Sequence, residues 1–255
     1  MRSRAGAEHL KVVTRSFDAA YFNDLANDPQ IRPFIGSPES GPLDLTALVE
    51  NPQNICLTAE AGGWMLFKLM PGAYELHTLF RPTGRGKKFF MAAREALRLV
   101  FTHTDALEIL TKCPEDNPGA RMAAILAGFR ERFRRENVWD GNVAISYQAL
   151  TIDDWFVRDP ECWAMGDRVG REIDSARLAA GWEMPPPRDD ASNYALGAAL
   201  LMLLGAQPDK AVGFYNRWAV FAGRETIVAL SAAMLDIQGA IAENVNGHLR
   251  LLPRT

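Results

Sequence analysis

Glycines and basic residues come together in one short stretch, residues 81–87, which reads Arg-Pro-Thr-Gly-Arg-Gly-Lys. The glycines on either side of Arg85 allow a tight turn that exposes backbone N–H groups. Arg81, Arg85, Lys87 and Lys88 bring positive charge to the same place. A helix that begins directly after the stretch adds the partial positive charge of its N-terminus. The stretch therefore predicts a site for an anion such as a diphosphate, and a solvated basic turn is the alternative.

The residues on either side of this stretch predict the elements that would position it. Residues 74–80 alternate in polarity, which is typical of a strand, with Glu75 and His77 on one side of it. Residues 88–102 change to a period of 3.6, with apolar side chains on one helical face and Arg94, Glu95 and Arg98 opposite. The local order is therefore strand, glycine-rich loop, helix.

A second motif follows further along the chain. Asn117, Ala120, Gly128 and Phe129 come after a predicted strand at residues 107–112. With the loop at residues 81–87, this motif resembles the GNAT superfamily of N-acetyltransferases in order and spacing. The resemblance covers roughly residues 8–156, and it implies a mixed, mostly antiparallel sheet flanked by helices, an α/β (α+β) fold.

The resemblance implies transfer of an acetyl group from acetyl-coenzyme A (acetyl-CoA), as co-substrate, to an amine. It also implies an oxyanion donor among the backbone N–H groups of the strand before the loop. The implied cofactor-binding residues lie in the strand end, the loop and the second motif: Leu79, Phe80, Arg81, Thr83, Gly84, Arg85, Gly86, Lys87 and Asn117.

An amine acceptor needs a base. An alkylammonium with a pKa near 10.4 is neutral in only about one molecule in a few thousand at pH 7. Glu75 and His77 share one strand face, and either could be that base. The alternative is a solvent-facing glutamate beside a structural histidine. His9, His103 and His248 have no spacing that indicates a metal site or a nucleophile dyad, so no metal is expected.

One position departs from the family pattern. Many members of the superfamily carry a tyrosine seven residues after the asparagine, where it acts as the general acid toward the thiolate, and here that position is Ala124. Tyr147 or a water molecule could replace it, and the sequence does not choose between them. Whether the chain turns over substrate is therefore open at this point.

Composition bounds the remaining possibilities. The chain has 255 residues, 48% of them hydrophobic, and a formal net charge of -3, which does not indicate binding to nucleic acid or to a membrane surface. The longest apolar run, residues 194–206, is too short to span a bilayer, and no leader is expected. Cys56, Cys113 and Cys162 are expected to be buried free thiols in a reducing compartment. A soluble protein of the cytoplasm is the expectation.

Two domains are predicted, a GNAT-like domain at residues 1–157 and a smaller all-helical module at residues 158–255. Strands are expected at residues 10–14, 55–60, 64–70, 130–138 and 143–150, and a short helix at 17–26, followed by a loop at 33–42. Helices are expected at 162–180, 191–204, 208–222 and 225–245, with the prolines at 185–187 as a linker.

A second hypothesis comes from another resemblance. Residues 27–36 and 147–155 are similar to segments of acetyltransferase-like proteins of tailed bacteriophages. This implies, as the alternative, a catalytically weak or inactive structural protein of a phage particle that binds other virion proteins through the helical module, in the host cytoplasm or the virion. A nucleic-acid acceptor would depend only on the arginines at 130–135, which are interpreted as a solvated strand edge.

Overall fold

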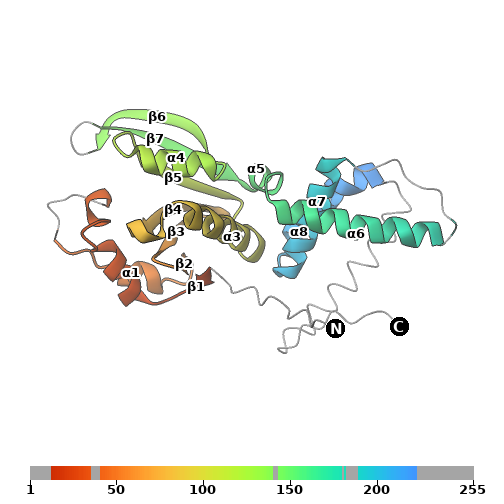
Figure 1. The fold of residues 1–255 in the computed structure, drawn as a ribbon, viewed down its shortest axis with the longest axis horizontal. Coiled ribbons are helices and arrows are strands. Elements are labelled where there is room, and N and C mark those ends of the chain that lie inside the picture. The colour runs from red at the N-terminus through yellow and green to blue at the C-terminus, as the bar shows by residue number, and fades with distance from the viewer. Residues whose placement is uncertain (1–12, 36–40, 140–142, 180, 182–188, 223–255) are drawn as a thin grey trace, which may run out of the picture. The chain divides into compact units, whose positions relative to one another are not determined.

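The computed structural model describes residues 13–35, 41–139, 143–179, 181 and 189–222, and these residues pack into two compact units (Figure 1). The first unit lies within Met1–Leu97 and Glu108–Leu150, and the second within Arg98–Leu107 and Thr151–Thr255. The predicted domain boundary after residue 157 stays a prediction.

The first unit is built on a mixed sheet whose described strands run in the order β1-β2-β3-β4-β5-β7-β6 (Figure 1). Neighbouring strands are antiparallel in the pairs β1–β2, β2–β3, β3–β4 and β6–β7, whereas β4 and β5 are parallel. The predicted mostly antiparallel sheet flanked by helices is confirmed. The strands are β1 (Thr14–Arg15), β2 (Ile55–Ala59), β3 (Gly62–Met70), β4 (Ala73–Phe80), β5 (Glu108–Pro114), β6 (Arg130–Trp139) and β7 (Val143–Thr151).

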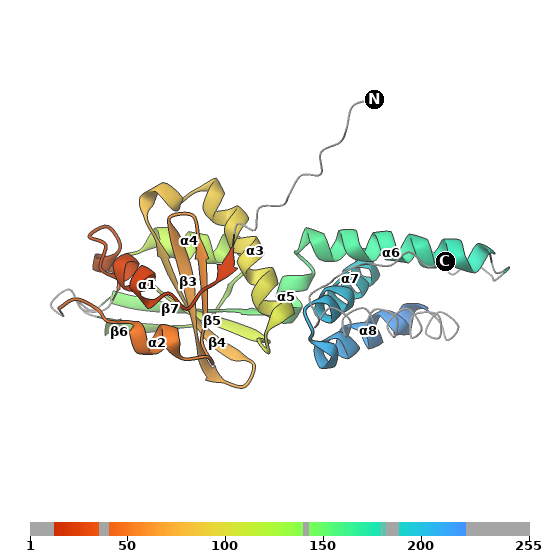
Figure 2. The ribbon, with the colours of Figure 1, turned by 90° about the horizontal axis from the view of Figure 1, so that it is seen from below.

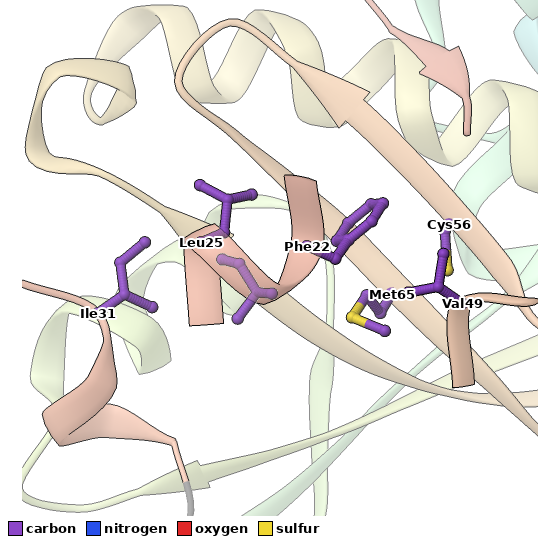
Figure 3. Close-up of a cluster of buried hydrophobic side chains, with 7 residues drawn as sticks. Phe22, Leu25, Ile31, Val49, Cys56 and Met65 are labelled. Carbon is purple, nitrogen blue, oxygen red and sulfur yellow. The ribbon is translucent and has the colours of Figure 1, made fainter. Parts of the chain in front are cut away.

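Two helices near the start of the chain cover one face of this sheet. α1 (Ala19–Ala26) begins after Asp18, whose carboxylate accepts a hydrogen bond from the N–H of Tyr21 at 3.0 Å. α2 (Thr46–Glu50) is short and was not predicted, because a single buried residue, Val49, gives no visible period. Both helices contribute to a buried cluster, shown in Figure 3, with the members Phe22, Leu25, Ile31, Val49, Cys56, Met65 and Leu79.

The opposite face of β3 and β4 packs against the long helix α3 (Lys87–His103) through aromatic rings. The ring of Phe80 lies 4.7 Å from that of Trp64 and 5.0 Å from that of Phe89, measured between centroids. The predicted helix at residues 88–102 is thus confirmed. Because β4 runs into α3 through the short 3-10 helix η2 (Pro82–Gly84), these contacts fix the loop at residues 81–87 between two packed elements.

The second unit is helical in its described part (Figure 2). It comprises α5 (Ile152–Phe156), α6 (Pro160–Ala179), α7 (Asp190–Leu204), α8 (Pro208–Ala222) and the last turns of α3. The helices predicted at 162–180, 191–204 and 208–222 are confirmed, and the one at 225–245 lies outside the described residues. An added Cβ at Gly197 of α7 would lie 1.6 Å from the carbonyl oxygen of Cys162 in α6, so glycine is required for this close approach.

The carboxyl end of α3 is held by a lysine of the second unit. The Nζ atom of Lys210 donates to the carbonyl oxygens of Phe101, Thr104 and Ala106, the last two at 3.0 and 2.9 Å. The bond to Phe101 satisfies a carbonyl group that the helix end leaves without a partner, and the other two bonds hold the segment that follows α3. Burial lowers the pKa of Lys210 to about 8, while the charge of Asp105 acts in the opposite direction.

Candidate functional site

The parallel strands β4 and β5 stop pairing after the first three residues of each. Their register joins Ala73 to Glu108, Tyr74 to Ile109 and Glu75 to Leu110, and no further pair follows. The Oγ1 atom of Thr111 still donates to the carbonyl oxygen of Leu76 at 3.2 Å. Beyond this bond, residues 77–80 of β4 and 112–114 of β5 continue with no mutual register, so the two strands diverge.

The divergence leaves backbone groups of β4 without a neighbouring strand. The N–H of Arg81 donates to the carbonyl oxygen of Ala61, so the odd-numbered residues of β4 direct their N–H and C=O groups toward β3. The even-numbered residues therefore direct theirs toward β5. The N–H groups of Thr78 and Phe80 thus face the side from which β5 has departed, and β5 offers them no acceptor there.

The loop after β4 ends in a second set of open donors. The first bond of α3 runs from the N–H of Phe90 to the carbonyl of Gly86. The N–H groups of residues 86–89 precede it and therefore have no acceptor within the helix. Gly86 has φ +78°, a left-handed conformation that favours glycine, with open space around the position of a Cβ. The helix N-terminus so formed is favourable for an anion.

Gly84 is favoured for a different reason. It is buried, and an added Cβ would lie 3.0 Å from the carbonyl oxygen of Glu60 and 3.2 Å from the Cβ of Ala61, both in the turn between β2 and β3. Absence of a side chain therefore lets the loop pack directly on that turn. The two glycines of the motif thus have separate roles, one in packing and one in backbone conformation.

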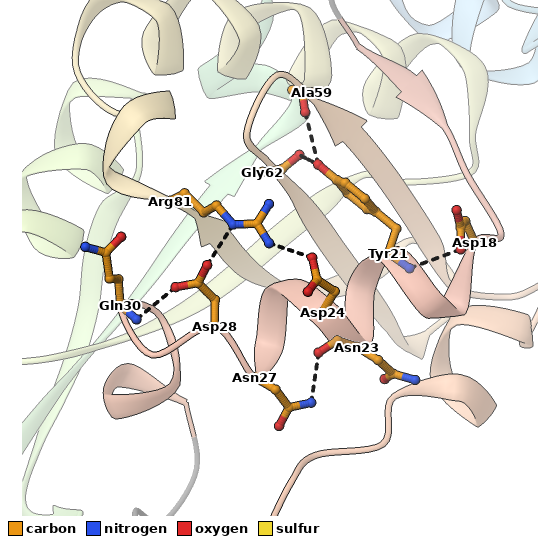
Figure 4. Close-up of polar contacts among 10 residues, drawn as sticks. All are labelled: Asp18, Tyr21, Asn23, Asp24, Asn27, Asp28, Gln30, Ala59, Gly62 and Arg81. Carbon is orange, nitrogen blue, oxygen red and sulfur yellow. Dashed lines mark hydrogen bonds and ion pairs between the residues drawn. The ribbon is translucent and has the colours of Figure 1, made fainter.

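The basic side chains of the loop mostly have partners within the protein. Figure 4 shows that the guanidinium of Arg81 contacts two aspartates. Its Nη2 lies 2.6 Å from Asp24 in α1, and its Nε lies 2.7 Å from Asp28, just after α1. Arg85 donates from Nε and Nη2 to the carbonyl oxygen of Phe80, at 3.2 and 3.1 Å. Lys88 pairs with Glu60 at 2.9 Å, whereas Lys87 is exposed. The sequence predicts positive charge here, and the structure uses much of it to hold the loop.

Asn117 lies at the start of α4 (Pro118–Leu126), directly after β5. Its Oδ1 atom accepts a hydrogen bond from the N–H of Ala120 at 3.0 Å, so the side chain is an N-cap. Ala124, in the same helix, offers no hydroxyl. Tyr147 on β7 stacks on Phe133 of β6, with ring centroids 4.4 Å apart. The assignment of Asn117 to cofactor binding stays a prediction.

Glu75 and His77 are in contact on the β4 face that α1 and α2 cover. Glu75 Oε1 lies 3.1 Å from His77 Nε2, and Glu75 Oε2 lies 2.8 Å from the Nζ of Lys112 on β5. The imidazole packs against Phe67 of β3 in a tilted arrangement, with ring centroids 4.8 Å apart. Burial lowers the pKa of His77, and this effect outweighs the carboxylate of Glu75, which raises it. His77 is therefore neutral at neutral pH.

Sequence reasoning missed Lys112, although the residue lies in a strand that it predicted. The signal that could have found it is the alternation of side chains along a strand. Leu110 pairs with Glu75, so Lys112, two residues further on, lies on the same face of the sheet as Glu75. That inference needs the β4–β5 register, which local sequence does not supply.

Cys56, Cys113 and Cys162 are buried and free, as predicted. Burial raises the pKa of the Cys56 and Cys113 thiols to about 11 and also raises that of Cys162, so none is a reactive thiolate at neutral pH. In the described part of the chain, no group of three or more His, Cys, Asp or Glu residues could hold a metal ion. None of the described helices has the length and apolar character needed to cross a membrane.

Comparison with known proteins finds similarity among solved structures. No family model matches the chain, and no curated protein matches it in sequence. A mutant of spermidine N-acetyltransferase SpeG from Vibrio cholerae aligns with TM-score 0.46 and 15% identity over 56% of this chain and 96% of that one. The same enzyme in complex with CoA and spermine aligns with TM-score 0.45 and 15% identity, over 56% and 98% of the two chains. An acetyltransferase (GNAT family) from Bacillus anthracis aligns with TM-score 0.45 and 16% identity, over 55% and 95%. Similarities at these levels do not establish an activity.

Proposed function

We propose that the first unit is a GNAT-type N-acetyltransferase that binds acetyl-CoA and transfers its acetyl group to an amine. The observation that carries this proposal is the divergence of β4 and β5 beside the open N-terminus of α3. β4 leads through η2 into α3, so one continuous segment supplies both sets of unused N–H groups.

The two sets of donors suit the two chemical parts of the co-substrate. The N–H groups of residues 86–89 and the exposed Lys87 would bind the diphosphate. The amide-containing pantetheine arm would lie along β4 in place of a paired strand, accepting hydrogen bonds from the N–H groups of Thr78 and Phe80. In this proposal Arg81 and Arg85 support the site and do not bind the ligand, because both already have partners within the protein. The other predicted residues of this segment shape the site: Leu79, Thr83 and Gly84.

The reaction needs two protons to leave the acceptor nitrogen. An ammonium R–NH₃⁺ first loses one proton to a base, and the neutral amine then attacks the thioester carbonyl carbon, so that a C–N bond forms and the C–S bond breaks. The second proton ends on the thiolate that leaves. An N–H of β4 that faces the divergence would stabilise the negative charge on the carbonyl oxygen, and Glu75 and His77 lie on the same strand for the proton transfer.

Ala124 bears on the rate rather than on the type of reaction. With no tyrosine at this position, protonation of the thiolate falls to water or to another group. General acid catalysis contributes roughly 100- to 10,000-fold, while positioning contributes separately, so slow turnover is expected rather than none.

The acceptor is proposed only as an amine. The alternative, a structural role in a phage particle with virion partners, stays a prediction from the sequence, and no feature of the described structure favours it. The two differ in one requirement, since only the acetyltransferase needs to bind acetyl-CoA.

The first experiment is therefore a binding measurement with acetyl-CoA on the full chain. At about 100 times its Kd, a ligand stabilises the folded state by about 2.7 kcal/mol. This raises the melting temperature by about 5–10 °C for a chain of this size. Unchanged melting at millimolar acetyl-CoA would contradict the proposal.

A matched pair of variants tests the position of the diphosphate. Thr83 is exposed in η2, so Thr83→Glu places a negative charge beside the open N–H groups, while Thr83→Gln adds the same bulk without charge. Thr83→Glu is expected to weaken acetyl-CoA binding at least about tenfold relative to Thr83→Gln, because like charges repel. Equal affinities in calorimetry would show that the diphosphate binds elsewhere.

A further inference from the structure

Both carboxylate oxygens of Glu75 have partners. Oε1 lies 3.1 Å from His77 Nε2, and Oε2 lies 2.8 Å from the ammonium of Lys112. The Glu75 side chain is only 16% exposed, whereas those of His77 and Lys112 are 41% and 44% exposed. Glu75 is thus the inner member of the group, and the imidazole and the ammonium are both partly exposed to solvent.

The contacts define how the imidazole is held. A neutral imidazole that donates from Nε2 to Glu75 carries its lone pair on Nδ1. Among the described residues, Nδ1 has no hydrogen-bond partner. The Phe67 ring packs against the imidazole at 4.8 Å and limits its rotation.

We infer that His77 Nδ1 is the general base of the proposed acetyl transfer, and that Glu75 and Lys112 are positioning residues that act through it. This inference rests on the proposed function. It separates the two candidates that the sequence leaves equivalent. Glu75, bridged between an imidazole and an ammonium, orients the base in the way that a carboxylate orients the histidine of a catalytic triad.

Lys112 also sets the charge of the site. The charged groups that act on His77 from the strands packed around it are Glu75 on β4 and Lys112 on β5, and β3 contributes the uncharged Phe67. Burial and the Lys112 ammonium lower the pKa of His77, whereas Glu75 raises it. Lys112 therefore helps keep the imidazole neutral, and only a neutral imidazole can accept the proton.

The proton balance follows from this assignment. One proton passes from R–NH₃⁺ to Nδ1 and gives an imidazolium, whose charge the Glu75 carboxylate stabilises. After C–N bond formation and C–S bond cleavage, the second nitrogen proton ends on the thiol, and the imidazolium returns its proton to water.

The test begins with a measurement that needs no turnover. The His77 ring is titrated by NMR in the full chain, with His77→Gln used to assign its signal. Lys112→Met is expected to raise the His77 midpoint, because a neighbouring cation is lost, and Glu75→Gln to lower it, because an anion is lost. Lys68→Met is the matched control: this lysine lies over Tyr74 on the opposite face of the sheet, and its removal is expected to leave the midpoint in place.

The kinetic arm uses an amine substrate found with the wild-type protein. His77→Gln is expected to lower kcat by about 100-fold or more with acetyl-CoA affinity unchanged, and Lys112→Met to move the acidic limb of kcat/KM upward with the His77 midpoint. Full activity in His77→Gln, or an unmoved midpoint in Lys112→Met, would overturn the inference while acetyl-CoA binding left the proposed function standing. Absence of acetyl-CoA binding would overturn both.

Discussion

Gly86 offers a direct test of the anion site, because its conformation is the only obstacle to a larger residue. Its φ of +78° costs an alanine roughly 1–2 kcal/mol, and no atom lies within 4 Å of an added Cβ, so no steric clash is superimposed. If the loop keeps its shape, Gly86→Ala lowers the free energy of unfolding by that amount. If the loop relaxes, the N–H groups at the start of α3 turn away, and about 1.4 kcal/mol of lost binding energy weakens acetyl-CoA affinity tenfold.

Gly86→Asn is the matched control, because asparagine adopts the left-handed conformation more readily than alanine. Urea unfolding gives the first quantity and calorimetric titration with acetyl-CoA the second. We expect Gly86→Ala to lose stability, affinity or both, and Gly86→Asn to lose clearly less of each. An alanine variant that equals the wild type in both measurements would refute the role of this conformation.

Two further predictions concern stability. Gly197→Ala is expected to destabilise the chain by about 2 kcal/mol or more, because its Cβ would lie 1.6 Å from the Cys162 carbonyl oxygen. The control, Gly213→Ala in α8, meets no atom within 4 Å and should stabilise the chain by up to about 1 kcal/mol. Equal urea midpoints for the two variants would contradict this prediction. The hydrogen bond from Arg81 lowers the pKa of Asp28 in the folded protein. The stability that this ion pair contributes is therefore fully present above the pKa of Asp28 in the unfolded chain, and it is lost as the pH falls through the pKa in the folded protein. The stability difference between Asp28→Asn and wild type should therefore shrink below about pH 4, and a difference that stays constant to pH 2 would argue against the ion pair.

Elements with a long, clear period were predictable from the sequence. α3 shows an apolar face over four turns, and β4 alternates over its whole length, so both were located within one residue of their observed ends. α2 has five residues and one buried position, too few to produce a period. Of the strand predicted at residues 10–14, only Thr14 falls in β1, which pairs with β2, and residues 10–12 lie outside the described residues.

The candidate site was predictable only where it is local. Alternation along β4 correctly put Glu75 and His77 on one face, because the side-chain period of a strand is two. The contact of Lys112 with Glu75 depends on the register of two parallel strands separated by a helix, and Arg81 meets Asp28 across 53 residues of sequence. The local sequence around these residues indicates neither contact, because tertiary packing alone determines both.

The partners of the loop arginines change how the basic motif would bind an anion. Arg81 joins the loop to two carboxylates at α1, and Arg85 binds the last carbonyl of β4, so both charges hold the backbone in place. Fixed N–H groups need no reorganisation when a ligand arrives, whereas a free arginine would lose side-chain entropy on binding. The arginines of the motif are therefore best understood as supports, and the main-chain donors at the start of α3 as the groups that would meet the diphosphate.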